Sequence, residues 1–224
     1  MSDTFYCIDN DIINKLATID LFENTLNILN TDYNHVKILV TYKYKFGKKE
    51  RKRSNQSNNY NLKKALEIAN KVSKISEENI NQELFIKLQN ISKSLNDPNK
   101  KIDKGEAILI SYLTDKNTLD SSSYLLTGDK NCLRALAIPE LVEIIKPLKG
   151  KIWCFEQLIL KNIDKDGFNT IQDKVYPFRD CDTYLNSVFG YIIKASEDTV
   201  KEELRKEITR LQKETGNILY PYPD

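Results

Sequence analysis

Short apolar runs with strand character alternate with helical segments through the first 163 residues, and this alternation limits the fold more than any other feature. β-branched, aromatic and other apolar residues predict strands at 4–8, 36–44, 124–127 and 152–155, with a helix as the alternative for 36–44. Apolar residues at helical spacing predict helices at 12–17, 62–75, 80–95, 107–113 and 157–163. Such alternation is typical of an α/β fold with a central, mainly parallel sheet flanked by helices. A functional site is then expected at the carboxyl ends of the strands.

The strand pattern ends near residue 164, which divides the chain into two parts. We predict an α/β domain at 1–163 and a helical C-terminal extension at 164–224. A charged helix at 199–213 carries one apolar seam, made of Val200, Leu204, Ile208 and Leu211. The seam is too short for an independent coiled coil, so we expect the helix to dock against the domain. The alternative is a subunit interface, which would make the protein a homodimer.

Composition excludes several classes of protein. With 224 residues and 40% hydrophobic content, the chain can bury a full core without a metal or disulfide to hold it together. Four widely spaced cysteines form no Cys-x-x-Cys pair, which argues against a zinc or redox motif and for buried, reduced thiols. The N-terminus lacks the pattern of a signal peptide, and no apolar run approaches the roughly 18 residues of a membrane span. We therefore expect a soluble, cytoplasmic protein with no membrane partner.

Positive charge is concentrated in one segment, residues 43–53, although the net charge of the chain is only +2. Glu50 is the single acid among seven basic residues: Lys43, Lys45, Lys48, Lys49, Arg51, Lys52 and Arg53. The interleaved aromatic residues Tyr42, Tyr44 and Phe46 could stack on bases. The segment is interpreted either as a solvated loop or as a surface that binds the phosphates of a nucleic acid.

Three acidic residues stand where the predicted sheet would bring them together. Asp9 ends the first strand, Asp129 follows the strand at 124–127, and Glu106 lies in the first turn of a helix just before that strand. If the two strands are neighbours, the carboxylates converge, and like charges at close range need protonation or a cation. Oxygen ligands without His or Cys favour Mg²⁺ or Mn²⁺. The sequence therefore predicts a metal site that could activate water for attack on a phosphodiester.

At these positions the chain resembles the PIN-domain (PilT N-terminus-like) family of metal-dependent ribonucleases over about residues 3–160. Asp9-Asn10-Asp11 is similar to the family's Asp-Thr-Asn motif, Gly105-Glu106-Ala107 to its Gly-Glu-Ala helix start, and Thr127-Gly128-Asp129 to its Thr-x-Asp motif. The resemblance implies a PIN-like domain at 1–163 that hydrolyses single-stranded RNA or tRNA with Mg²⁺ or Mn²⁺. It implies Asp9, Glu106 and Asp129 as metal ligands, with Asn10 and Thr127 as residues that orient them.

The resemblance has one departure. PIN nucleases usually carry a glutamate on the helix after the second strand, whereas this chain has the basic segment there. Asp11, Asp103 and Glu156 are the alternatives for that place; otherwise the site binds one ion weakly, or activity is lost. Relatives of this type include toxins restrained by an antitoxin and components of RNA-processing and defence systems, so an antitoxin or another protein is an expected partner.

Three other interpretations compete with the nuclease. A catalytically degenerate PIN-like module would bind RNA or protein through the basic segment. A haloacid-dehalogenase-like phosphatase would use Asp9-x-Asp11, but Cys132 and Leu133 stand where its further Asp is expected. Residues 162–173 have several positions of a calcium-binding EF-hand loop, although a plain turn between helices fits them better because Asp173 replaces the bidentate Glu.

Overall fold

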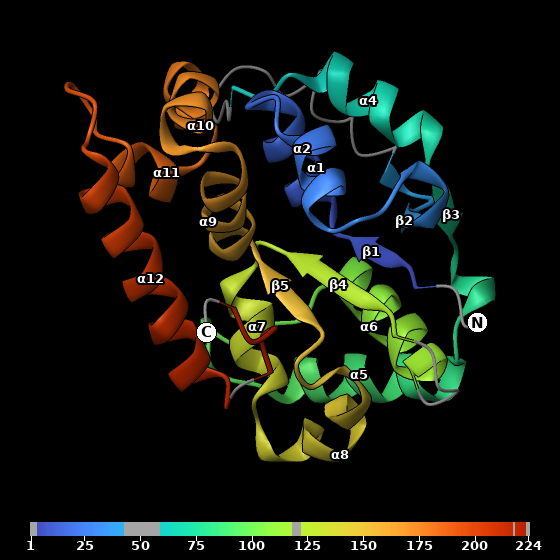
Figure 1. Cartoon of the computed structure of the whole chain (residues 1–224). Helices are drawn as coiled ribbons and strands as arrows, with labels where there is room; N and C mark the ends of the chain where they lie inside the picture. Colours follow the sequence, from blue (N-terminus) through green and yellow to red (C-terminus); the bar gives the residue numbers. More distant parts are fainter. Residues whose placement is uncertain (1–3, 43–58, 118–121, 217, 223–224) are drawn as a thin grey trace.

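A five-stranded parallel sheet forms the centre of the computed structural model, which describes residues 4–42, 59–117, 122–216 and 218–222. The strand order is β3-β2-β1-β4-β5, and each pair of neighbours is parallel (Figure 1). The strands are β1 (Tyr6–Ile8), β2 (Val36–Leu39), β3 (Ser73–Ile75), β4 (Tyr124–Thr127) and β5 (Ile152–Cys154). β1 is central and fully buried, as strands of a parallel sheet covered on both faces must be.

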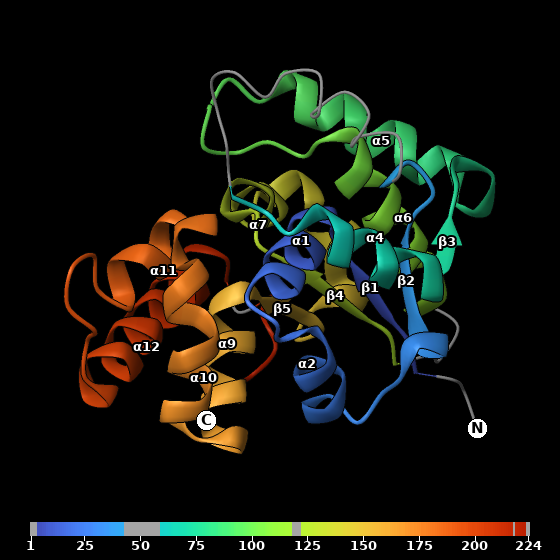
Figure 2. The ribbon, with the colours of Figure 1, turned by 90° about the horizontal axis from the view of Figure 1, so that it is seen from above.

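Helices cover both faces of the sheet. On one face lie α1, α2, α4 and α9, and on the other lie α5, α6, α7 and α8 (Figures 1 and 2). The helices are α1 (Asn10–Thr18), α2 (Phe22–Ile28), α4 (Leu62–Lys71), α5 (Gln82–Ser94), α6 (Lys104–Asn117), α7 (Lys130–Leu136), α8 (Val142–Ile145), α9 (Phe155–Asp166), α10 (Phe168–Val175), α11 (Thr183–Val188) and α12 (Glu197–Glu214). Short 3₁₀ turns span Tyr33–His35, Glu77–Asn79, Pro139–Leu141, Lys146–Leu148 and Tyr176–Cys181.

The predicted α/β fold with a parallel sheet is confirmed, with two corrections to its elements. The predicted strand at 36–44 ends at Leu39, which is followed by a turn. The predicted helix at 62–75 ends at Lys71, and its last three residues form β3 instead. β3 pairs in register with β2, Lys37 opposite Ser73 and Leu39 opposite Ile75. Tertiary pairing therefore decides the conformation of a segment whose local pattern also fits a helix.

The C-terminal part of the chain packs directly on the α/β part. α9 begins immediately after β5 and runs through the predicted boundary at 163. α12 packs against α9 and α7, and its whole apolar seam, Val200, Leu204, Ile208 and Leu211, is buried within the chain, as predicted. Gly167, with a φ of 85°, makes the turn between α9 and α10, which gives a plain turn rather than a calcium loop at 162–173.

The structure shows the state of the cysteines and the character of the helices. All four cysteines, Cys7, Cys132, Cys154 and Cys181, are buried free thiols, as predicted. Among the described residues, no helix has the length and apolar character needed to cross a bilayer.

Candidate functional site

The order of the strands creates a switch point between β1 and β4. From β1 the chain proceeds to β2 and β3 on one side, and then crosses back to β4 on the other side. In open parallel sheets, ligands bind outside the carboxyl ends of the strands at this point. Asp9 follows β1 directly, and Asp129 follows β4 with only Gly128 between them. The topology therefore brings two of the predicted ligands to the switch point.

Both aspartates cap the helices that begin there. Asp9 is the N-cap of α1, and one of its carboxylate oxygens accepts a hydrogen bond from the Asn10 backbone N–H at 2.7 Å. Asp129 is the N-cap of α7, and its Oδ1 accepts from the backbone N–H groups of Asn131 and Cys132 at 2.8 and 3.0 Å. These backbone amides fix the direction of each carboxylate and stabilise its negative charge. The second oxygen of Asp129 accepts no hydrogen bond from the described residues.

Glu106 is held at the start of α6 by a reciprocal pair of hydrogen bonds with Asp103. The Asp103 backbone N–H donates to Glu106 Oε2 at 2.6 Å, and the Glu106 backbone N–H donates to Asp103 Oδ1 at 2.8 Å. This is the geometry of a capping box. Gly105 allows it, because a Cβ there would lie 2.8 Å from Leu39 Cδ1 and 3.2 Å from Asp103 Oδ1. The glycine before Glu106 thus lets α6 begin close against β2.

The electrostatics place Glu106 among the other acids. Burial raises the pKa of Glu106 to about 9, and the negative charges of Asp129, Asp103 and Asp9 add to this effect. Glu106 is buried, with only 6% of its surface exposed. Burial and the same carboxylates, Glu106 first among them, also raise the pKa of the Cys132 thiol. A proton or a cation stabilises a buried carboxyl group that is repelled by other carboxylates.

Asp11, one of the alternatives for the missing acid, is paired with a lysine. Lys15 Nζ lies 2.5 Å from Asp11 Oδ2 and 2.7 Å from Asp182 Oδ2, and the Tyr60 hydroxyl donates to Asp11 Oδ1 at 2.9 Å. Burial lowers the pKa of Lys15, but the two aspartates outweigh this effect and raise it. Each oxygen of Asp11 therefore already has a hydrogen-bond donor.

Glu156, another alternative, has a similar partner. It lies in the first turn of α9 and is 3% exposed, and its Oε1 is 2.9 Å from Lys130 Nζ. The same ammonium lies 2.6 Å from Glu207 Oε1 of α12 and 4.5 Å from the centre of the Tyr184 ring. The structure therefore places both Asp11 and Glu156 in ion pairs with buried or half-buried lysines, whereas Asp103 holds Glu106.

The two residues predicted to orient the ligands lie beside them. Thr127 is buried, and its hydroxyl accepts a hydrogen bond from the Asp129 backbone N–H at 3.2 Å, which shapes the turn after β4. Asn10 is 8% exposed, and neither polar atom of its side chain has a hydrogen-bond partner among the described residues. A buried amide without partners is uncommon, and a bound water, ion or substrate would supply the missing hydrogen bonds.

The donor set fits a hard divalent cation. Asp9, Glu106 and Asp129 supply only oxygen atoms, and one oxygen of each is oriented by a backbone N–H. In the described parts of the chain, no three His, Cys, Asp or Glu side chains already stand close enough to hold a metal ion. Binding of one shared ion would therefore require these side chains to move toward it.

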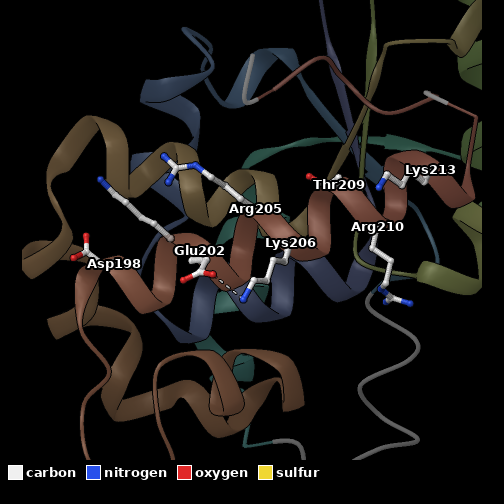
Figure 3. Close-up of a pocket in the computed structure, with 8 residues that line it drawn as sticks. Asp198, Glu202, Arg205, Lys206, Thr209, Arg210 and Lys213 are labelled. Atoms are coloured by element: carbon white, nitrogen blue, oxygen red, sulfur yellow. Dashed lines mark ion pairs between the residues drawn. The ribbon is translucent and has the colours of Figure 1, made fainter.

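A hollow on the exposed face of α12 is a second surface feature (Figure 3). It is lined by basic residues, but their charges are balanced along the same helix. Lys206 pairs with Glu202 and Glu203, each at 2.9 Å, and Arg210 pairs with Glu207 and Glu214. This balance gives the hollow no strong preference for an anion, so we assign it no site.

The sequence analysis did not predict the lysines that pair with Asp11 and Glu156. Lys15 follows Asp11 by four residues, a spacing that brings two side chains together on a helix and could have indicated the pair. No local signal links Lys15 with Asp182, which is 167 residues away in the chain. The predicted RNA-binding residues at 43–53 lie outside the described residues.

Comparison of the chain with protein-family models, curated proteins and solved structures finds no match.

Proposed function

We propose that this chain is a Mg²⁺- or Mn²⁺-dependent endoribonuclease of PIN-like type. The observation that carries the proposal is the position of Asp9 and Asp129 after the two strands that flank the switch point, with the buried Glu106 beside them. Three carboxylates without His or Cys are suited to magnesium or manganese, and the order of the motifs in the sequence is similar to that of PIN nucleases.

The roles of the residues follow from their places. Asp9, Glu106 and Asp129 would hold the ion, and their backbone hydrogen bonds limit the rearrangement needed to bind it. Thr127 keeps Asp129 in place through the turn after β4. When bound, the ion would lower the pKa of a water molecule and orient a phosphodiester for in-line attack. Asn10 follows Asp9, and its amide has no hydrogen-bond partner within the described parts of the chain, so it is suited to contact the substrate or a water.

The basic residues at 43–53 remain the predicted RNA-binding segment. If they contact several phosphates, the affinity for RNA falls steeply as salt is raised, because counterions are released on binding. The resemblance to PIN nucleases also favours a role as a toxin with an antitoxin partner, or in RNA processing or defence.

The test is cleavage of labelled single-stranded RNA and tRNA by the purified protein with manganese, magnesium or a chelator. Asp129→Asn keeps a good N-cap for α7 but removes the negative charge. We expect metal-dependent cleavage by the wild type and a loss of about 100-fold or more in the variant. The matched control is Asp32→Asn, which also alters an N-cap aspartate. Asp32 lies just before β2, at the amino ends of the strands and so away from the switch point.

Equal cleavage by the wild type and Asp129→Asn would contradict the proposal. RNA binding without cleavage under any metal condition would favour the degenerate module instead. Hydrolysis of a phosphate monoester that is lost in Asp9→Asn, without cleavage of RNA, would favour the phosphatase.

A further inference from the structure

Lys15 occupies an unusual place at the carboxyl edge of the sheet. It lies on α1, its side chain is only 10% exposed, and its ammonium bridges Asp11 at 2.5 Å and Asp182 at 2.7 Å. The ring of Phe155 lies beneath the same ammonium, 5.1 Å from Nζ to the ring centre. Lysine is seldom buried to this extent without a specific set of partners.

The ammonium also lies against the turn that carries Asp129. A Cβ on Gly128 would be 3.4 Å from Lys15 Nζ and 3.1 Å from Asp11 Oδ2. The Asp11–Lys15 pair therefore touches the Thr127-Gly128-Asp129 turn from the side of α1. It lies beside the turn that carries Asp129, and a second metal ion bound by Asp11 would have to share this place with the ammonium.

The charges at this place resemble those of a filled cation site. Asp11 offers two oxygen atoms, and both have donors: Lys15 at Oδ2 and the Tyr60 hydroxyl at Oδ1. A divalent ion on Asp11 would lie within a few ångströms of a buried ammonium, where repulsion between the two charges is only weakly screened. Glu156, the other nearby acid, is engaged by Lys130 in the same manner.

We propose that the Lys15 ammonium takes the place of a second metal ion, so that the site holds one divalent cation and Asp11 is excluded from its ligands. This inference depends on the proposed function, because it assumes that Asp9, Glu106 and Asp129 bind the first ion. Lys15 acts here as a positioning residue: it supplies positive charge at a fixed place and holds Asp11 away from the ion. The glutamate that PIN nucleases usually carry after the second strand is then not required.

The experiment is a titration of the purified full chain with Mn²⁺, in which calorimetry gives the number of ions bound. We expect one Mn²⁺ for the wild type. Asp11→Asn, an accessible substitution that leaves Lys15 and Asp182 paired, should also bind one ion, with a change in affinity of less than about threefold. Asp129→Asn should weaken binding by about tenfold or more.

The decisive variant is Lys15→Met combined with Asp182→Asn, which removes the buried charge and its second partner together and so leaves no isolated buried charge. Asp11 then becomes available, and we expect two Mn²⁺ per chain. Adding Asp11→Asn to this variant should return the number to one. The control is Lys201→Met, since Lys201 also bridges two acids, Glu197 and Asp164, but on the outer side of the molecule.

Each result is informative. Two ions on the wild type, a loss of affinity of about tenfold in Asp11→Asn, or one ion on a folded Lys15→Met/Asp182→Asn variant would overturn the inference about Lys15. If RNA cleavage still depends on Asp129 in those cases, the proposed function survives. No Mn²⁺ on the wild type would overturn both.

Discussion

At the scale of single residues, the buried Glu106 makes the stability of the folded protein sensitive to pH. Its ordinary pKa of 4.5 rises to about 9 on folding, mainly through burial and then through the charge of Asp129. An acid with a raised pKa binds a proton more tightly in the folded state than in the unfolded state. Its contribution to stability therefore falls as the pH rises from 4.5 toward 9.

We predict that Glu106→Gln stabilises the metal-free protein at pH 7, by about 2 kcal/mol in the free energy of unfolding. The amide keeps an acceptor for the Asp103 backbone N–H but carries no charge to bury. Urea unfolding at pH 5 and pH 7 with chelator measures this, and the gain should be smaller at pH 5. Adding Mn²⁺ should raise the melting temperature of the wild type and not that of the variant.

The control for this prediction is Glu140→Gln, which changes an exposed glutamate and should alter neither quantity. A variant less stable than the wild type at pH 7, or one that keeps the full response to Mn²⁺, would contradict the role given to Glu106.

At the scale of elements, α12 is attached to the domain by an apolar seam and by charged contacts, one of which is made by the buried Glu207. Glu207 of α12 is 8% exposed and pairs with Lys130 at 2.6 Å and with Arg210. Burial alone would raise the pKa of Glu207, but hydrogen bonds from Arg210 and Lys130 outweigh it and lower the pKa from 4.5 to about 2. The stability from this contact is present above pH 4.5 and is lost as the pH falls toward 2.

We predict that Glu207→Gln lowers the free energy of unfolding by about 2 kcal/mol at pH 7 and by about half as much at pH 3. Urea unfolding at the two values of pH measures the difference. Glu202→Gln is the matched control. Glu202 forms an exposed pair with Lys206 on the same helix, so its substitution should change the free energy of unfolding little at either pH. An equal cost of Glu207→Gln at both pH values would show that the contact is not ionic.

The elements also show which parts of the fold can be predicted from sequence. β4 was predicted at its observed bounds because Tyr124 to Thr127 is a continuous run ended by Gly128. β3 was missed because Ser73-Lys74-Ile75 has one strongly apolar residue and continues a helical pattern. Strands that are short and at an edge depend on their partner strand more than on their own residues.

In the candidate site too, some residues can be located from sequence and others cannot. Asp9, Glu106 and Asp129 could be located from sequence because each directly follows a strand or opens a helix, so local pattern determines its place. The partners of Lys15 and Lys130 could not, because Asp182 and Glu207 come from the distant C-terminal part of the chain. Contacts of this kind arise only when the whole fold is assembled.

At the scale of the whole molecule, the last described residues return to the edge of the sheet. Leu219 forms a parallel bridge with Ile152 of β5, and the Gln157 side chain donates to the carbonyls of Tyr220 and Tyr222 at 2.7 Å. The Tyr220 ring stacks on Trp153, with 4.1 Å between ring centres. The C-terminal segment therefore covers the β5 edge, which would otherwise offer unpaired backbone groups to another chain.

We predict that Tyr220→Ala lowers the free energy of unfolding by about 2 kcal/mol, through loss of the stacked ring and of the apolar area it buries. Trp153 is the only tryptophan in the chain, so all tryptophan fluorescence comes from the residue that Tyr220 covers. Its emission should shift to longer wavelength in the folded variant as water reaches the indole. The control is Tyr191→Ala, which removes a tyrosine that is 61% exposed and should change neither the stability nor the emission. An unshifted Trp153 emission in Tyr220→Ala would mean that the C-terminal segment does not shield β5.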